Sequence, residues 1–336
     1  LSVYLRYSQL LSQTVDFPDE CYQGNYIYEI AQILIDKHGD KLLNNKDDIL
    51  FKDTAEQHIF KDIKNTLKKI KIEFDNFFNE DSLYKNKAIF DVIDSLRNKN
   101  LIYEKDGATW FQGTQIGRPD DRVLIKSTGE PTYRLPDIAY HKNKLDRNFD
   151  LIIDIFGADH MDAYPDVLAA LEQLGYDMNK ISVLIHQFAT VTENGESVKM
   201  STRKANFITL DELIDEVGVD VVRYFFLMRG ANTHLNFDME VAKSESDENP
   251  VFYLQYAYAR ISNIINRSLD LGYEQSNVPD LNLLNSDIEL ELINNLIAFP
   301  DCIHQVTEKL EPQIIINYLQ NTAILFHRFY SKNKVL

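Results

Sequence analysis

Two apolar runs on either side of a helical segment constrain the fold of this chain more than any other feature. Residues 150–159 (DLIIDIFGAD) and 181–191 (ISVLIHQFATV) each have the composition of a strand buried in a parallel sheet. Between them, residues 164–177 (YPDVLAALEQLGYD) show helical spacing, and Gly175 is placed to end that helix. Because parallel neighbours need a crossover connection, this order predicts an open α/β sheet.

Short β hairpins are predicted ahead of this segment. Residues 101–112 contain two β-rich runs around a turn at Gly107, and a second hairpin is expected to turn at Gly129. We expect the last strand of the second hairpin to end at Tyr133. The helix that follows carries Pro136, a residue suited to a first turn.

Helical patterns dominate both ends of the chain. Residues 1–75 are predicted to be helical, including a lysine-bearing helix at about 53–71. The lysines of this helix could contact phosphate, but a solvated helix face is the favoured interpretation. Nearly all of the chain beyond residue 208 shows helical spacing. The predicted divisions are a helical segment (1–80), an α/β part (81–207), a helical connection (208–244) and an α-helical bundle (245–336).

Length and composition limit the classes of protein to consider. The 336 residues are 44% hydrophobic and 26% charged, typical of a folded chain with two or three domains. We expect no secretory leader, and no apolar run reaches the roughly 18–20 residues that span a membrane. Cys21 and Cys302 lack metal-ligand spacing, so we expect no protein-bound metal and a reducing, cytoplasmic compartment. A net charge of −17 argues against a generally basic nucleic-acid surface but leaves room for a local patch.

One loop concentrates cations in this acidic chain. Residues 196–207 read ESVKMSTRKANF. Its cations and neighbouring hydroxyls are Lys199, Arg203, Lys204, Ser201 and Thr202. Such a loop could donate charge-assisted hydrogen bonds to a polyphosphate and stabilise a leaving pyrophosphate. On charge alone, a solvated basic loop is the favoured interpretation.

Three further residues could line the crevice at the carboxyl ends of the predicted parallel strands. Tyr133 and Asp137 could hold a cationic ligand, and a guanidinium matches a carboxylate best. The alternative, favoured from the residues alone, is that Asp137 only caps its helix. His160 follows a strand end, but a lone histidine is more often structural.

Aromatic residues on the long helix after residue 247 suggest a different kind of contact. Tyr253 and Tyr256 lie one turn apart, with Tyr258 and Arg260 nearby. Such side chains can stack on unpaired bases. Core packing is the default alternative.

In this order the segments are similar to class I aminoacyl-tRNA synthetases, and specifically to arginyl-tRNA synthetases. KMSTR at 199–203 resembles the "KMSKS" loop of that class. TYRLPDIAYH at 132–141 and IFGADH at 155–160 resemble arginyl-tRNA synthetase stretches. VDVVR at 219–223 resembles the D-A-L-R-type box that names the anticodon-binding domain of the family.

The resemblance implies a fold and a reaction. The fold is the second half of a Rossmann-like α/β catalytic domain, with a helical insertion, followed by an all-α anticodon-binding bundle. The reaction is arginine–tRNA ligation: arginine attacks the α-phosphate of ATP, aided by Mg²⁺, and the arginyl group then passes to tRNA(Arg). Positioning and charge stabilisation would supply most of the catalysis. We expect the protein to be a cytoplasmic monomer that has no membrane as a partner.

The resemblance also assigns residues. The loop that would bind ATP comprises Lys199, Met200, Ser201, Thr202, Arg203 and Lys204, and its cations Lys199, Arg203 and Lys204 would be catalytic. Residues implied in arginine binding are Tyr133, Asp137 and His160. Residues implied in tRNA binding are Tyr253, Tyr256 and Arg260.

Two departures from the family pattern limit these expectations. Thr202 stands where the "KMSKS" pattern has its second lysine, so the cation that takes over its role is left open. The chain contains no H-x-G-H sequence, the motif that supplies the other half of the ATP site. We therefore expect a fragment, with this motif upstream of Leu1 and further bundle helices after Leu336, and negligible arginylation by this chain alone.

Two other functions remain open at this point. One is a non-catalytic tRNA-binding protein descended from a synthetase; the joint presence of Tyr133, Asp137 and the loop at 199–204 counts against it. The other is a class I synthetase for another amino acid. Asp137 disfavours it, because this carboxylate suits a cationic side chain.

Overall fold

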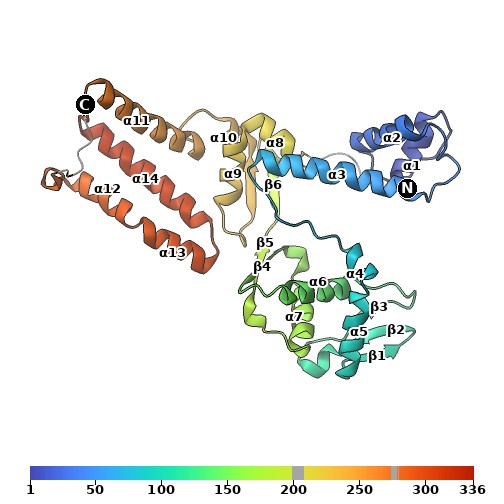
Figure 1. The fold of residues 1–336 in the computed structure, drawn as a ribbon. Helices are drawn as coiled ribbons and strands as arrows, with labels where there is room; N and C mark the ends of the chain where they lie inside the picture. Colours follow the sequence, from blue (N-terminus) through green and yellow to red (C-terminus); the bar gives the residue numbers. More distant parts are fainter. Residues whose placement is uncertain (199–207, 274–277, 279) are drawn as a thin grey trace. The chain divides into compact units, whose positions relative to one another are not determined.

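Two units divide the chain in the computed structural model, which describes residues 1–198, 208–273, 278 and 280–336 (Figure 1). Unit 1 comprises residues 1–73, 189–230 and 235–336, and unit 2 comprises residues 74–188 and 231–234. Each unit is described by itself below.

Unit 2 contains an antiparallel sheet with the order β1-β2-β3. Its strands are β1 (Ile102–Lys105), β2 (Ala108–Phe111) and β3 (Arg122–Ile125). The turn between β1 and β2 has φ values of 53° at Asp106 and 72° at Gly107. Positive φ at both central residues matches the right-handed twist of a two-residue hairpin, which confirms the first predicted hairpin.

The second predicted hairpin is much shorter than expected. After β3 the chain turns at Gly129, whose φ is 85°, and forms a single bridge between Ile125 and Pro131. Proline has no N–H to continue a ladder. The prediction that Tyr133 ends a strand is wrong, because its φ and ψ of −57° and −24° are already helical and it directly precedes α6 (Arg134–Asp146).

The predicted strand–helix–strand segment is present in unit 2. Strands β4 (Ile152–Gly157) and β5 (Ile181–His186) pair in parallel over their whole length, and α7 (Tyr164–Gln173) connects them. Short 3₁₀ turns flank α7 at Ala158–His160 and Met178–Lys180. The second strand was predicted to reach residue 191, but it ends at His186. Residues 189–193 form β6, which pairs in a different sheet.

In the parallel sheet of unit 2, strand β4 is buried on one face only. Along β4, Ile152 is 7% exposed and Asp154 is 6% exposed, whereas Ile153 and Ile155 are 42% and 68% exposed. The expectation of a strand buried on both faces is therefore wrong for β4. Successive side chains point to opposite faces of a strand, and only one face is covered.

Apolar packing orients α6, which carries several of the candidate residues. Leu135, Ile138 and Ala139 are at most 2% exposed. They pack in one cluster with residues of α5 (Ala88–Asn98), α7 and the short helix α4 (Asp81–Lys85). Helical periodicity then places Asp137 off this buried face, toward the edge of the unit.

A buried carboxylate joins four segments of unit 2. Asp166, in the first turn of α7, is 2% exposed. Its oxygens accept hydrogen bonds from the Nε atoms of Arg118 at 3.0 Å, Arg122 at 3.2 Å and Arg134 at 3.2 Å. These arginines come from the turn after η1 (Gly113–Ile116), from β3 and from the start of α6. One side chain therefore fixes the first turns of α6 and α7 to the sheet.

Unit 1 begins with three helices, in the part of the chain that was predicted to be helical. They are α1 (Ser2–Leu10), α2 (Asn25–His38) and α3 (Ile49–Lys69). Figure 1 shows α1 and α2 at the amino-terminal end of α3. α2 ends at Gly39, whose φ of 63° favours glycine.

A small mixed sheet and three helices form the next part of unit 1. They are β6 (Ala189–Glu193), β7 (Glu196–Ser197), β8 (Leu235–Asp238), α8 (Leu210–Val217), α9 (Val219–Leu227) and α10 (Met239–Lys243). β8 corrects the expectation of almost wholly helical structure beyond residue 208. The carboxylate of Asp211 in α8 accepts hydrogen bonds from Thr66 and Lys69 of α3. Arg223 in α9 donates a hydrogen bond to the main-chain oxygen of Ile70. Arg223, the arginine of the VDVVR stretch, therefore has a structural role, because it binds the carboxyl-terminal end of α3.

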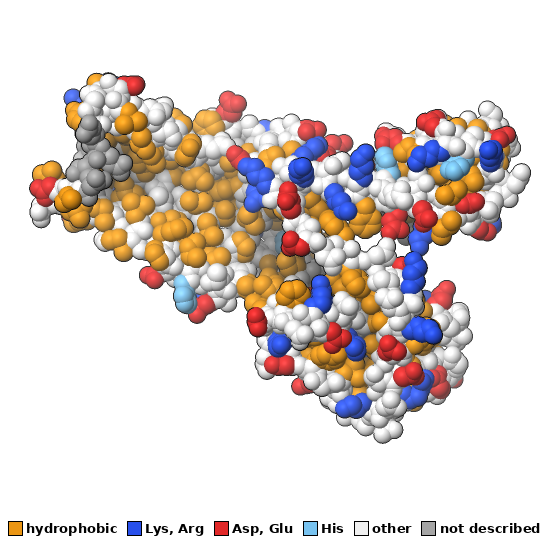
Figure 2. Space-filling model, in the orientation of Figure 1, with side chains coloured by type: hydrophobic (Ala, Val, Ile, Leu, Met, Phe, Trp, Pro, Cys, Tyr) orange, Lys and Arg blue, Asp and Glu red, His pale blue; other side chains and the backbone are white. Residues whose placement is uncertain are grey.

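The predicted helical bundle completes unit 1. Its helices are α11 (Pro250–Asp270), α12 (Asp287–Ile297), α13 (Phe299–Lys309) and α14 (Gln313–Lys332), with a 3₁₀ turn at Leu281–Leu283. Figure 2 shows apolar side chains gathered over the bundle. Exposed apolar residues of α12–α14 include Leu290, Leu296, Ile297, Phe299, Ile303 and Ile324. No helix in the part of the chain that the structure describes is long and apolar enough to cross a membrane.

Candidate functional site

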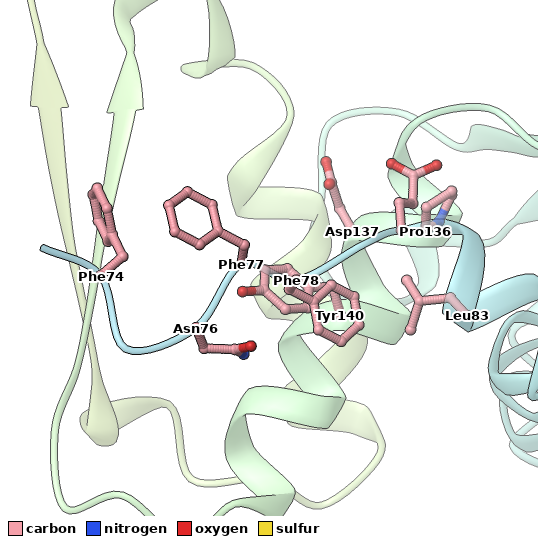
Figure 3. Close-up of a pocket in the computed structure, with 9 residues that line it drawn as sticks. Phe74, Asn76, Phe77, Phe78, Leu83, Pro136, Asp137 and Tyr140 are labelled. Carbon is pink, nitrogen blue, oxygen red and sulfur yellow. The ribbon is translucent and has the colours of Figure 1, made fainter. Parts of the chain in front are cut away.

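Asp137 lies at a cavity of about 380 Å³ within unit 2. Figure 3 shows the cavity between the extended segment at 74–78 and the first turns of α6. Four of its lining residues are aromatic: Phe74, Phe77, Phe78 and Tyr140. Two are carboxylates, Asp137 and Glu80. An apolar wall with a few charged groups is the usual construction of a small-molecule pocket.

The aromatic wall is assembled from two parts of the chain. Phe78 stacks on Tyr140 of α6, with ring centroids 4.3 Å apart and planes 29° apart. Phe74 and Phe77 meet edge to face at 5.6 Å (Figure 3). Such faces can receive the flat side of a cation or an aliphatic chain.

The environment of Asp137 disfavours an unpaired negative charge. Burial raises the pKa of its carboxyl group above the usual value, and the nearby Glu80 raises it further. His141, His160 and Lys144 act in the opposite direction, but the net direction is upward. The electrostatic cost of ionisation would fall if a cation entered the pocket.

Glu80 is a candidate residue that the sequence did not reveal. It lies 57 positions before Asp137, immediately ahead of α4, and lines the same cavity. Nothing in its local sequence links it to α6. The only signal is an acidic residue that follows the aromatic run at 74–78.

The structure places Tyr133 one helical turn before Asp137. The Tyr133 side chain is 59% exposed, and its hydroxyl accepts a hydrogen bond of 3.1 Å from Nη1 of Arg134. It does not line the cavity around Asp137, although residues four apart share a helix face. Its predicted contact with arginine stays a prediction.

His160 lies beyond the carboxyl end of β4, where the sequence placed it. Its side chain is half exposed and stacks on Phe156 with centroids 5.7 Å apart. Its charge lowers the pKa of Asp137, so the two side chains are electrostatic neighbours. The structure therefore brings His160 near Asp137 without a direct hydrogen bond between their side chains in the described part of the chain.

A buried ionic network lies behind Asp137. His141 of α6 is 4% exposed, with its Nε2 2.9 Å from a carboxylate oxygen of Asp154 and its Nδ1 2.8 Å from the main-chain oxygen of Asp137. Lys144 donates to the other oxygen of Asp154. Burial alone would raise the pKa of Asp154, but the hydrogen bonds from these two residues outweigh it and lower that pKa.

A second candidate site lies on the bundle of unit 1, where α11 meets α14. Arg260 donates to the hydroxyl of Tyr256, and its guanidinium lies 4.2 Å from the Tyr256 ring centroid and 4.9 Å from that of Tyr330. His327 contacts the rings of Tyr253 at 4.7 Å and Tyr256 at 5.6 Å. The three predicted residues are thus brought together, and α14 adds His327 and Tyr330, which no sequence pattern had singled out.

The predicted ATP loop lies outside the described residues. This applies to Lys199, Met200, Ser201, Thr202, Arg203 and Lys204. Among the residues that the structure describes, no group of three or more His, Cys, Asp or Glu side chains is placed to hold a metal ion.

Two family models match this chain. Residues 34–227 match the catalytic domain of class I tRNA synthetases of the arginine type, and residues 254–336 match the DALR anticodon-binding domain. The first match alone covers more than half of the chain. The chain belongs to the arginyl-tRNA synthetase family. Its fold is accordingly a class I catalytic α/β domain followed by a helical anticodon-binding domain.

Individual relatives agree with this assignment. The chain is 51% identical to the arginine–tRNA ligase of Desulfotalea psychrophila and 50% identical to that of Chlorobium phaeobacteroides, over its full length in both cases. It covers 61% and 62% of those proteins, or about three fifths of their length.

Solved structures show the same fold. A Campylobacter jejuni structure described as an arginyl-tRNA synthetase is 33% identical, with a TM-score of 0.88, and the match covers 99% of this chain and 73% of that one. Thermus thermophilus arginyl-tRNA synthetase has a TM-score of 0.73 at 16% identity, over 99% of this chain and 66% of that one, which supports the fold alone.

Proposed function

We propose that this chain carries the arginine pocket and the anticodon-binding region of an arginine–tRNA ligase. The observation that supports the proposal most directly is that Asp137 and Glu80 line the same aromatic-walled cavity, in a chain of this family. The substrates would be L-arginine, ATP with Mg²⁺, and tRNA(Arg). The protein would act as a cytoplasmic monomer, and the four segments predicted from the sequence would be its domains.

The pocket suits a guanidinium better than any other natural side-chain group. A guanidinium is planar and always charged, and it can donate to two carboxylates while its face lies on an aromatic ring. Asp137 and Glu80 supply the acceptors, and Phe77 and Tyr140 supply rings of the same cavity. A cation held there would offset the repulsion between the two carboxylates.

The chemistry would follow the order of the class I reaction. The arginine carboxylate attacks the α-phosphate of ATP, which forms arginyl-adenylate and releases pyrophosphate, and a terminal ribose hydroxyl of the tRNA then takes the arginyl group. We propose Lys199, Arg203 and Lys204 as the cations that stabilise the phosphates, with Met200, Ser201 and Thr202 in the same loop. Tyr133 and His160 would complete the arginine site.

L-citrulline distinguishes this proposal from simple shape recognition, because it replaces the guanidinium with a neutral urea of the same size. We expect calorimetric titration of the chain to show L-arginine binding at least about 30-fold tighter than L-citrulline, since a buried charged partner is worth roughly 2–5 kcal/mol. L-lysine should also bind more weakly, because its ammonium cannot donate in a planar fork.

Equal affinity for arginine and citrulline would contradict the proposal. The alternative is a non-catalytic tRNA-binding protein of the same family, and it makes a different prediction. It would bind tRNA in a filter-binding assay while L-arginine produced no heat in the calorimeter.

The cluster on α11 and α14 predicts the location of tRNA contact. Replacing Tyr256 with alanine should weaken tRNA(Arg) binding roughly 5- to 100-fold, because stacking of a base on an aromatic ring is worth about 1–3 kcal/mol. Fluorescence anisotropy at one fixed salt concentration measures the change, since phosphate contacts depend strongly on salt.

Two variants of the same helix control this experiment. Tyr256→Phe keeps the ring and loses only the hydroxyl that bonds Arg260, so most of the affinity should remain. Tyr258→Ala removes a tyrosine that is 74% exposed, two residues away and outside the cluster. An equal loss in Tyr258→Ala and Tyr256→Ala would rule out a specific contact at the cluster.

A further inference from the structure

Both ring nitrogens of His141 lie within hydrogen-bond distance of an oxygen atom. Nδ1 faces the main-chain oxygen of Asp137 at 2.8 Å, and Nε2 faces a carboxylate oxygen of Asp154 at 2.9 Å. A carbonyl oxygen can only accept. Asp154 also accepts from the ammonium of Lys144, a group that can only donate, which favours a carboxylate that accepts from His141 as well. Both ring nitrogens of His141 thus face acceptors, an arrangement that an imidazolium, with two N–H donors, can satisfy completely.

The network around this imidazolium carries a surplus of positive charge. It contains two cations, His141 and Lys144, and one anion, Asp154, all of them less than 10% exposed. The next carboxylate along α6 is Asp137, whose main-chain oxygen faces the imidazolium. A buried surplus charge is stabilised by a nearby opposite charge, because little water reaches it.

We infer that His141 is a positioning residue for the pocket: locked as an imidazolium by Asp154, it holds the helix turn of Asp137 and keeps that carboxylate ionised for a guanidinium ligand that His141 itself does not touch. The inference about the ligand rests on the proposed function. The inference about the charge of His141 and its effect on Asp137 does not.

Charged groups from three parts of the chain contribute to this balance. Asp137 is influenced by Glu80 from the segment before α4, by His160 after β4, and by His141 and Lys144 of its own helix. Of the two groups on α6, His141 has the larger effect toward the ionised carboxylate.

A carboxylate and two aromatic rings also lie close to His141. Asp154 faces it from β4, and the rings of Tyr140 and Phe156 lie 6.3 Å and 6.1 Å from its own.

Removing the charge of His141 has opposite consequences in acid and in alkali. Without the imidazolium, the pKa of Asp137 rises further, so a larger share of the carboxyl is protonated in acidic solution and a guanidinium binds less well there. In alkaline solution the carboxyl is ionised in either protein, and the absence of a nearby cation removes a repulsion on the ligand. A loss of packing alone would instead weaken binding to a similar degree at every pH.

The first experiment needs no ligand. The Asp137 carboxyl carbon is titrated by NMR in the unmodified chain, in His141→Gln and in Lys142→Gln. Lys142 is a matched control: it lies on α6 and carries the same charge, but pairs with Asp146 at 2.8 Å and does not line the Asp137 cavity. We expect the titration midpoint to rise by roughly one pH unit in His141→Gln and to stay unchanged in Lys142→Gln.

A second experiment tests the link to the ligand. Calorimetry with L-arginine at pH 5.5 and pH 8.5 should show His141→Gln binding several-fold more weakly than the unmodified chain at pH 5.5 and no more weakly at pH 8.5. Because the titration midpoint is expected to rise by roughly one pH unit, the loss of affinity should not exceed about tenfold. His141→Lys keeps a cation that can reach Asp154 and should restore binding at pH 5.5.

The possible outcomes separate the two proposals. An unchanged Asp137 midpoint in His141→Gln, or nitrogen-15 shifts of His141 that show a neutral ring at pH 7, would overturn this inference whether or not arginine binds. If the unmodified chain fails to bind L-arginine but the midpoint rises as expected, the proposed function fails and the electrostatic role of His141 stands. Equal weakening of binding at both pH values would reduce His141 to a packing residue.

Discussion

Replacing Asp137 with asparagine is expected to weaken the binding of L-arginine roughly 30-fold or more. The substitution keeps the size of the side chain but removes the charge that would pair with the guanidinium. Loss of one partner from a buried, hydrogen-bonded charge pair costs about 2–5 kcal/mol. Calorimetric titration at pH 7.5 measures the change. Asp146→Asn is the matched control, because Asp146 lies on the same helix, pairs with Lys142 and does not line the cavity.

The same substitution should stabilise the ligand-free chain. Asp137 has a raised pKa in the folded state, so the folded state binds more protons than the unfolded state between the two pKa values. Stability contributed by this group is therefore lost as the pH rises through that window. Asp137→Asn should melt at a higher temperature than the unmodified chain at pH 7.5, with the difference shrinking as the pH falls. A lower melting temperature at pH 7.5 would mean that Asp137 serves the fold and not a ligand.

Local chemistry accounts for the parts of the fold that the sequence predicted. The Asp106–Gly107 pair turns the first hairpin because both residues adopt a positive φ, which few other residues tolerate. The parallel pairing of β4 and β5 follows from the helix between them. In each case the signal and the structure lie close together along the chain.

The candidate site depended on contacts that no local pattern specifies. Glu80 reaches the cavity of Asp137 through the path of the chain after α3, and His327 reaches Tyr256 only because α14 packs on α11. The sequence assigned His160 and Asp137 correctly to a strand end and a first helical turn. It could not show that His141 connects Asp137 to Asp154, because that network depends on the depth of burial.

The failed expectation for β4 has a physical cause as well. Its sequence is largely apolar, as in strands covered on both sides, and composition alone cannot show which face is covered. Ile153 and Ile155 share the exposed face, whereas Asp154 is buried among its ionic partners on the other. Composition therefore did not indicate that an aspartate lies on the buried face of β4 and that two isoleucines lie on its exposed face.

The largest effect on stability is expected from Asp166→Asn. An amide offers one acceptor oxygen without charge, so the arginines that share Asp166 lose their common counter-charge. Breaking a buried ionic network by removing one partner costs about 3–5 kcal/mol. Because Asp166 ties α7 to β3 and to the start of α6, the loss should be local to unit 2.

Hydrogen exchange under native conditions can show whether the loss of stability is confined to unit 2, because it reports the protection of each segment separately. We expect amides of α7 and β3 to lose roughly 100-fold or more in protection in Asp166→Asn, and amides of α2 and α11 in unit 1 to change little. Asp120→Asn is the control, since the Asp120 side chain is 63% exposed and pairs with Arg122 at 3.3 Å, an arrangement worth at most about 1 kcal/mol. Equal losses of protection in the two variants would show that the three arginines do not depend on a single buried carboxylate. Such a result would leave the apolar cluster beneath α6 as the main support of the pocket.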